Sequence, residues 1–162
     1  MNTAFERSAN GKDEWLTPPE IIKALGRFDI DPCAPIVRPW DTAEKHFTRE
    51  DNGLTQTWEG RVWLNPPYGT EAGKWLKRLA YHGSGIALTF ARTETKMFFE
   101  SVWGKADAVL FLSGRLRFYD VNGKRGGTAG APSVLIAYGK ENVEALKRSG
   151  LKGYFIKLTE AK

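Results

Sequence analysis

The chain has 162 residues, 41% of them hydrophobic and 27% charged, and it carries a formal net charge of +5. This size and balance indicate one globular domain with a real core, and no apolar run approaches the roughly 20 residues that a membrane-spanning helix needs. Cys33 is the only cysteine, which excludes an internal disulfide and a cysteine-cluster metal site.

Before the first predicted element, residues 1–12 are polar, and we expect them to be flexible. They lack the layout of a signal peptide, so we expect a cytoplasmic protein. The first element is a helix over residues 17–26, in which Thr17 caps the start and Glu20 completes a capping box. No linker divides the rest of the chain, so residues 13–162 are expected to form a single domain.

Strands and helices then alternate along the chain. Apolar runs predict five strands, at 27–32, 61–65, 85–90, 107–112 and 133–139. Helical patterns fall at 71–82, 93–104 and 141–150. This alternation predicts a layered α/β fold with a mostly parallel sheet. Ligands of such sheets bind at the carboxyl ends of the strands, so Asp31 and Asn65, which each end a strand, are expected on one rim.

The strand at 61–65 ends in Asn-Pro-Pro-Tyr, an unusual sequence for a sheet. Pro66 and Pro67 lack amide hydrogens, so they end the ladder and fix a rigid corner. This corner could hold an aromatic amine: the oxygens of Asn65 and Pro66 would accept its two hydrogens, and Tyr68 would stack on the ring. Such acceptors favour an amine that gains positive charge as it attacks. The alternative is a proline-rich turn that only ends the strand.

Six segments, in this order, resemble the phage-type DNA adenine-N6 methyltransferases, which use S-adenosylmethionine. They are DEWLTPPEIIKAL (13–25), FDIDPCAP (28–35), EDNGL (50–54), VWLNPPYG (62–69), ARTETKMFF (91–99) and GRLRF (114–118). The resemblance implies an abbreviated Rossmann-like class I methyltransferase sheet with helices on both faces. It also implies site-specific methyl transfer to adenine N6 in double-stranded DNA, with the target adenine flipped out of the duplex. A phage origin, and hence a bacterial host cytoplasm, rests on this resemblance alone.

The resemblance also assigns site residues. The residues that would hold and stack the target base are Asn65, Pro66, Pro67 and Tyr68. The residues that would bind the cofactor are Trp15, Thr17, Pro18, Asp31, Pro32, Ala34 and Asp51. Among them, Asp31 would face the methionine amino group and Asp51 would bind the ribose hydroxyls. Glu50 is the rival of Asp51 for that role, and an ordinary turn at residues 51–53 is the alternative.

The chain departs from the family pattern in two places. The glycines usual after the first strand are replaced by Pro-Cys-Ala-Pro at residues 32–35, where the small Ala34 still permits a close approach. We interpret Cys33 as a small core residue. Only 29 residues separate Asp31 from Arg61, barely one βαβ unit, which takes roughly 30 or more.

Charge is distributed unevenly along the chain, in a pattern that is relevant to binding of a nucleic acid. Residues 1–73 carry 8 basic and 12 acidic side chains, whereas residues 74–127 carry 10 and 4. A basic middle indicates a surface for a polyanion, although lysines that solvate helices would also explain it. The expected DNA contacts are Arg92, Lys96, Arg115, Arg117, Lys124 and Arg125. The alternative for Arg92 and Arg115 is an ion pair with Asp29, Glu94 or Asp107.

Residues 122–130 are expected to form a flexible basic loop with a tight turn at Asn122-Gly123. His46 and His82 lack partners at ligand spacing, so we expect no metal site. No separate target-recognition domain is evident, and we expect a monomer or a weak dimer. Two alternatives to DNA methylation stay open. One is a related methylase of RNA or of protein glutamine; the other is a DNA-binding protein that retains the fold without activity.

Overall fold

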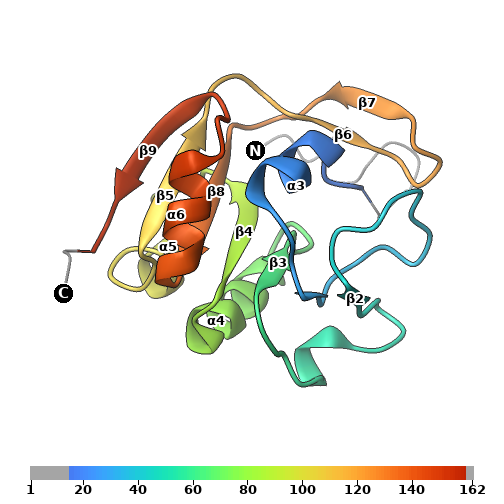
Figure 1. The fold of residues 1–162 in the computed structure, drawn as a ribbon, viewed down its shortest axis with the longest axis horizontal. Helices are drawn as coiled ribbons and strands as arrows, with labels where there is room; N and C mark the ends of the chain where they lie inside the picture. The colour runs from blue at the N-terminus through green and yellow to red at the C-terminus, as the bar shows by residue number, and fades with distance from the viewer. Residues whose placement is uncertain (1–14, 160–162) are drawn as a thin grey trace.

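The structure, a computed structural model, describes residues 15–159, so the flexible segment expected at residues 1–12 lies outside the described residues. Its centre is a seven-stranded sheet with the order β2-β1-β3-β4-β8-β5-β9 (Figure 1). The strands are β1 (Ile30–Asp31), β2 (Lys45–His46), β3 (Val62–Leu64), β4 (Gly85–Phe90), β5 (Ala108–Leu112), β8 (Ser133–Tyr138) and β9 (Gly153–Lys157). The strands β1 to β4 pair in parallel, whereas β8 is antiparallel to both β4 and β5, and β9 is antiparallel to β5. Strand β5 therefore runs in the same direction as β1 to β4, and the predicted α/β fold is confirmed.

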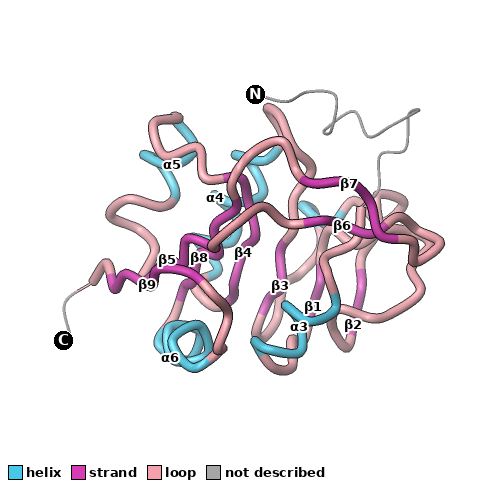
Figure 2. Tube along the Cα trace, turned by 90° about the horizontal axis from the view of Figure 1, so that it is seen from above, coloured by secondary structure: helices cyan, strands magenta, loops and turns pink. Residues whose placement is uncertain are grey.

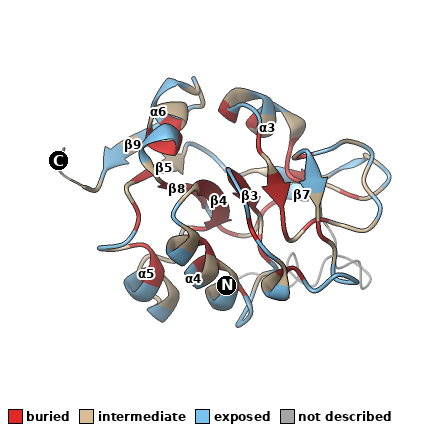
Figure 3. Ribbon diagram, turned by 60° about the horizontal axis from the view of Figure 1, so that its bottom comes forward, coloured by how far each residue is buried: buried red, intermediate tan, exposed pale blue. Residues whose placement is uncertain are grey.

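Helices cover both faces of the sheet (Figure 2). They are α3 (Pro19–Leu25) and α6 (Lys140–Arg148) on one face, and α4 (Ala72–His82) and α5 (Lys96–Ser101) on the other. Every residue of the central strands β4 and β8 is buried, which explains their continuous apolar sequences (Figure 3). Helix α4 places Leu76 and Leu79 on one side, three residues apart, and buries both against the sheet. None of the helices within residues 15–159 is long and apolar enough to cross a membrane.

The start of α3 differs from the prediction. The helix begins at Pro19, and Pro18 occupies the cap position with no side-chain capping bond. Thr17 therefore precedes the cap, and the capping box expected with Glu20 does not form. The Thr17 hydroxyl instead accepts a hydrogen bond from the Asn65 amide, 3.1 Å away. This long-range contact links the segment before α3 to the end of β3.

The expected flexible loop at residues 122–130 is a hairpin instead. Strands β6 (Arg117–Tyr119) and β7 (Arg125–Thr128) pair antiparallel as a separate two-stranded sheet. The predicted turn at Asn122-Gly123 is confirmed: Gly123 has a φ of 83°, and the Asp120 carboxylate accepts hydrogen bonds from the amides of residues 122 and 124, each 2.9 Å long. Glycine-rich strands lack the apolar alternation that would have predicted them.

The connection between β1 and β3 is compact. Within residues 32–61, the structure contains only β2 and a 3₁₀ turn, η1 (Gly53–Thr55), and no α-helix. A Cβ atom on Gly53 would overlap the carbonyl oxygen of Pro32, so only glycine allows this close approach. The Trp58 indole donates a hydrogen bond to the Gly53 carbonyl, 2.9 Å away. The turn is thereby fixed against the segment that comes after β1.

Candidate active site

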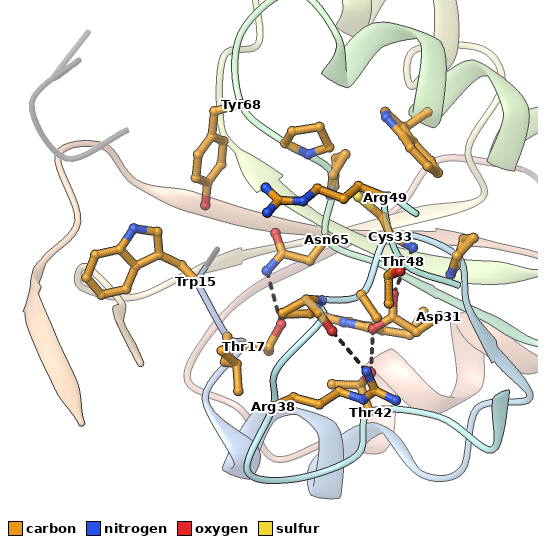
Figure 4. A pocket seen from close by; sticks show the side chains of 18 of the residues that line it. Trp15, Thr17, Asp31, Cys33, Arg38, Thr42, Thr48, Arg49, Asn65 and Tyr68 are labelled. Carbon is orange, nitrogen blue, oxygen red and sulfur yellow. Dashed lines mark hydrogen bonds between the residues drawn. The ribbon is translucent and has the colours of Figure 1, made fainter. Parts of the chain in front are cut away.

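A cavity of about 390 Å³ opens at the carboxyl ends of β1 and β3, as expected for a sheet of this kind. Its wall is formed mainly by residues 15–17, 31–35 and 65–68, and by four tryptophans: Trp15, Trp40, Trp63 and Trp75. Asp31 and Asn65 both line it, which confirms that they share one rim (Figure 4). The cavity combines flat aromatic walls with a few polar groups, which is typical of small-molecule sites.

Asp31 is the buried acidic group of the cavity. One carboxylate oxygen accepts a hydrogen bond from the Cys33 amide at 3.1 Å, and the other accepts one from the Thr42 hydroxyl. Burial raises the pKa of Asp31 to about 6, although both hydrogen bonds and the charge of Arg38 favour the ionised form. At neutral pH the carboxylate is therefore charged, and a cationic ligand would stabilise that charge.

Asn65 presents its side-chain oxygen to the cavity in a fixed orientation. It directly follows β3, whose three residues are completely buried, so its backbone position is set by the core. Its side-chain nitrogen donates to Thr17, which leaves the oxygen as the acceptor. The carbonyl of Pro66, which also lines the cavity, accepts no hydrogen bond from residues 15–159. Two acceptors thus lie next to each other at this corner.

The ring of Tyr68 is held by aromatic neighbours. Phe90, at the end of β4, stacks on it with ring centroids 4.3 Å apart and an angle of 3° between the planes. Phe118 makes an edge contact at 6.4 Å. In the close view, Tyr68 lies on the same side of the cavity as Asn65 and Trp15 (Figure 4). Stacking of a ligand on Tyr68 would use the face opposite Phe90.

Comparison with known proteins identifies the family of this chain. A sequence model of the DNA N-6-adenine-methyltransferase (Dam) family matches residues 6–145 of the 162. The chain belongs to this family. It is therefore a DNA adenine-N6 methyltransferase, and this decides among the substrates that the sequence left open. No curated protein and no solved structure is significantly similar to the chain.

The cavity of the methyltransferase collects most of the predicted site residues. It is lined by all four expected to hold the base, Asn65, Pro66, Pro67 and Tyr68. It is also lined by five of those expected to bind the cofactor: Trp15, Thr17, Asp31, Pro32 and Ala34. Pro18 is buried at the N-cap position of α3 and is not among the lining residues. Asp51 is not among the lining residues, but its exposed carboxylate accepts from the amide of Thr48, which lines the cavity, at 2.8 Å and closes a turn.

Several lining residues of the methyltransferase were not predicted. Cys33 packs against the hydrophobic core, as interpreted, and because it is only half-buried it lines the cavity as well. The connection between β1 and β3 adds four polar or charged residues, Arg38, Thr42, Thr48 and Arg49. This connection has no periodic pattern, so nothing in its sequence singled them out. Among residues 15–159, no group of three His, Cys, Asp or Glu side chains could hold a metal ion.

Two of the expected DNA contacts lie at a second cavity, of about 680 Å³, beside α4 and α5. It shares Pro66 and Tyr68 with the first, and Arg92 and Lys96 line it. Within the described part of the chain, Arg92 makes no ion pair, and its Nε and Nη2 atoms are buried without a hydrogen-bond partner. The ion pair considered as the alternative for Arg92 is therefore not formed.

The other four expected DNA contacts belong to the β6–β7 hairpin or precede it. Arg115 donates to the Ala129 carbonyl at 3.4 Å, and Arg117 donates to the Gly126 carbonyl at 2.8 Å. Lys124 and Arg125 are exposed at the turn and at the start of β7. The hairpin adjoins the first cavity, because Tyr119 packs edge-on against Trp40 with ring centroids 5.2 Å apart.

Proposed function

We propose that this methyltransferase transfers the methyl group of S-adenosylmethionine to an adenine that is flipped out of the duplex into the first cavity. The single observation that carries the proposal is the placement of the Asn65 and Pro66 oxygens in the same cavity as the buried carboxylate of Asp31. A base must leave the stack for its amino group to be reached. The supporting geometry is the pair of acceptors beside the held ring of Tyr68.

The residues of the cavity fit this cofactor. Its methionine end carries an ammonium group, which the ionised carboxylate of Asp31 would bind. Its adenosine and its sulfonium would lie against the tryptophan walls, since aromatic faces attract both flat rings and cations. The volume of about 390 Å³ lies within the range of small-molecule sites. When bound, the cofactor supplies a methyl group made electrophilic by the positive sulfur.

The protein's own part in the reaction is to orient and stabilise the amine. Asn65 Oδ1 and Pro66 O would accept the two hydrogens of adenine N6, which directs the nitrogen lone pair toward the methyl group. As N6 gains positive charge, these oxygens would stabilise it more strongly than in the starting state. The adenine ring would stack on Tyr68, which Phe90 holds in place.

The fold supports a Rossmann-like class I arrangement. Strand β1 lies between β2 and β3. The chain therefore passes from β1 to β2 at the edge of the sheet and then returns to form β3 on the other side of β1. The cavity lies at this reversal of strand order, where open α/β sheets bind their ligands. DNA would approach along the basic residues of the second cavity and the hairpin, whose cations would contact phosphates.

The test compares products and binding in one set of variants. Wild-type protein, labelled S-adenosylmethionine and unmethylated DNA should yield N6-methyladenine, measured by mass spectrometry of the digested nucleosides. Asn65→Ala should lower the rate by about 10² or more, as for other preorganised polar groups, while cofactor and DNA binding stay nearly intact. Exposed Thr57→Ala, at a residue that lines neither cavity, serves as the control and should retain full activity. An Asn65→Ala variant as active as wild type would refute the assignment of the site.

A further inference from the structure

Among residues 15–159, two cationic side chains line the first cavity, and they occupy different surroundings. Arg38 lies at the end away from Tyr68, close to Asp31 and Thr42 (Figure 4). Its side chain is only 23% exposed, whereas Arg49 is an exposed residue. Of the two, Arg38 is thus the one placed next to the buried carboxylate.

The guanidinium of Arg38 is held by its own loop through one edge. Its Nη1 atom donates to the Pro35 carbonyl at 2.9 Å and lies 3.5 Å from the Ile36 carbonyl. Its Nε atom lies 3.7 Å from the carboxylate of Asp41, which is 77% exposed. Nη2 donates no hydrogen bond to residues 15–159. The group is therefore fixed in position with donor capacity left over at Nη2, while Nε is buried and only its partner Asp41 is largely solvated.

An α-amino acid presents opposite charges on adjacent groups, because its ammonium and its carboxylate share one carbon. A site for such a ligand needs an anion and a cation side by side, and Asp31 and Arg38 supply this pair at one end of the cavity. We propose that Arg38 binds the carboxylate of the cofactor's methionine end through Nη2 while Asp31 binds its ammonium. This inference rests on the proposed function, and it makes Arg38 the residue that selects a cofactor with a complete amino-acid end.

The experiment measures the affinity of the full-length protein by calorimetry for two ligands, S-adenosylmethionine and decarboxylated S-adenosylmethionine. Arg38→Gln should weaken binding of the first by about 10- to 100-fold, the range for a hydrogen bond to a charged group, and leave binding of the second within about twofold. Arg38→Lys keeps the charge and should fall between wild type and Arg38→Gln for the first ligand. Arg49→Gln is the matched control, and it should preserve the wild-type discrimination between the ligands.

The outcomes separate this inference from its alternatives. If Arg38→Gln and Arg38→Lys weaken both ligands equally, Arg38 only closes its loop and the inference is overturned. It is also overturned if Arg49→Gln, rather than Arg38→Gln, removes the discrimination. If wild-type protein binds neither ligand, the proposed cofactor site itself fails, and the role of Arg38 fails with it. Thermal unfolding of each variant checks that it is folded.

Discussion

At the scale of a single residue, the buried carboxylate of Asp31 would give the proposed cofactor site a pH dependence. Burial raises the pKa of Asp31 to about 6, so the group is charged above this pH and protonated below it. The ligand's α-amino group loses its proton at about pH 8. We therefore expect cofactor affinity to be highest between about pH 6 and 8 and to fall by up to about tenfold for each pH unit below 6.

The expected pairing of the ligand's ammonium with the Asp31 carboxylate can also be detected by calorimetry. An ammonium next to Asp31 favours the ionised carboxylate, so binding at pH 6 should lower the pKa of Asp31 and release a proton. The binding enthalpy at this pH should then vary with the ionisation enthalpy of the buffer. Asp31→Asn should abolish both effects and bind the cofactor more than about tenfold more weakly. Wild-type affinity that stays constant from pH 5 to 8 would contradict the role of Asp31.

Thr17 is expected to act through the orientation of Asn65. Its hydroxyl accepts the hydrogen bond from Asn65 Nδ2, and without it the amide could rotate and present its nitrogen to the adenine. Thr17→Val should lower the single-turnover methylation rate by about 3- to 10-fold, the value of one ordinary hydrogen bond. Thr17→Ser keeps the hydroxyl and should restore most of the rate. Equal losses in the two variants would indicate a packing role instead.

At the scale of elements, the sequence patterns predicted the strands whose residues are buried in the core. The runs that became β4 and β8 were found because both faces are buried, and buried faces demand continuous apolar residues. Strands β2 and β9 were missed because they lie at the edges of the sheet and are mostly exposed, so their sequences carry no such pattern. The Asn-Pro-Pro-Tyr corner was recognisable from local chemistry. Arg38 was not, since only the path of an irregular connection brings it to Asp31.

Arg61 connects three elements at the amino end of β3. Its buried guanidinium donates to the Leu25 carbonyl at 2.7 Å, at the end of α3, and to Asn142 Oδ1 at 2.6 Å, in α6. Removing the donor leaves buried acceptors unpaired, so Arg61→Met should lower the free energy of unfolding by about 3 kcal/mol. Arg27→Met removes an exposed arginine and should change it by less than about 1 kcal/mol. Urea unfolding measures both values, and equal effects would refute the role of Arg61.

At the scale of the whole molecule, the hairpin is expected to contribute to DNA binding through charge. Each phosphate contact releases counterions, so removing Lys124 and Arg125 together should lower the slope of affinity against salt by up to about two. Binding should weaken alike on all DNA sequences, because phosphate contacts carry no sequence information. Replacing both Lys147 and Lys152, near the chain end, is the control, and it should change the slope of affinity against salt much less. Equal slopes for wild type and the hairpin variant in a salt titration would remove the hairpin from the DNA surface.

The attachment of the hairpin has a thermodynamic consequence. Tyr119 of β6 and Leu16 exchange two backbone hydrogen bonds, of 2.7 and 3.0 Å, and Leu16 lies between Trp15 and Thr17 in the wall of the first cavity. A hairpin that shifts on contact with DNA would thus shift the wall of the proposed cofactor cavity. Ligands coupled in this way affect each other equally, so any gain in cofactor affinity that DNA produces must reappear as the same gain in DNA affinity when cofactor is present. Two short backbone bonds would thereby couple the binding of cofactor and DNA to this methyltransferase.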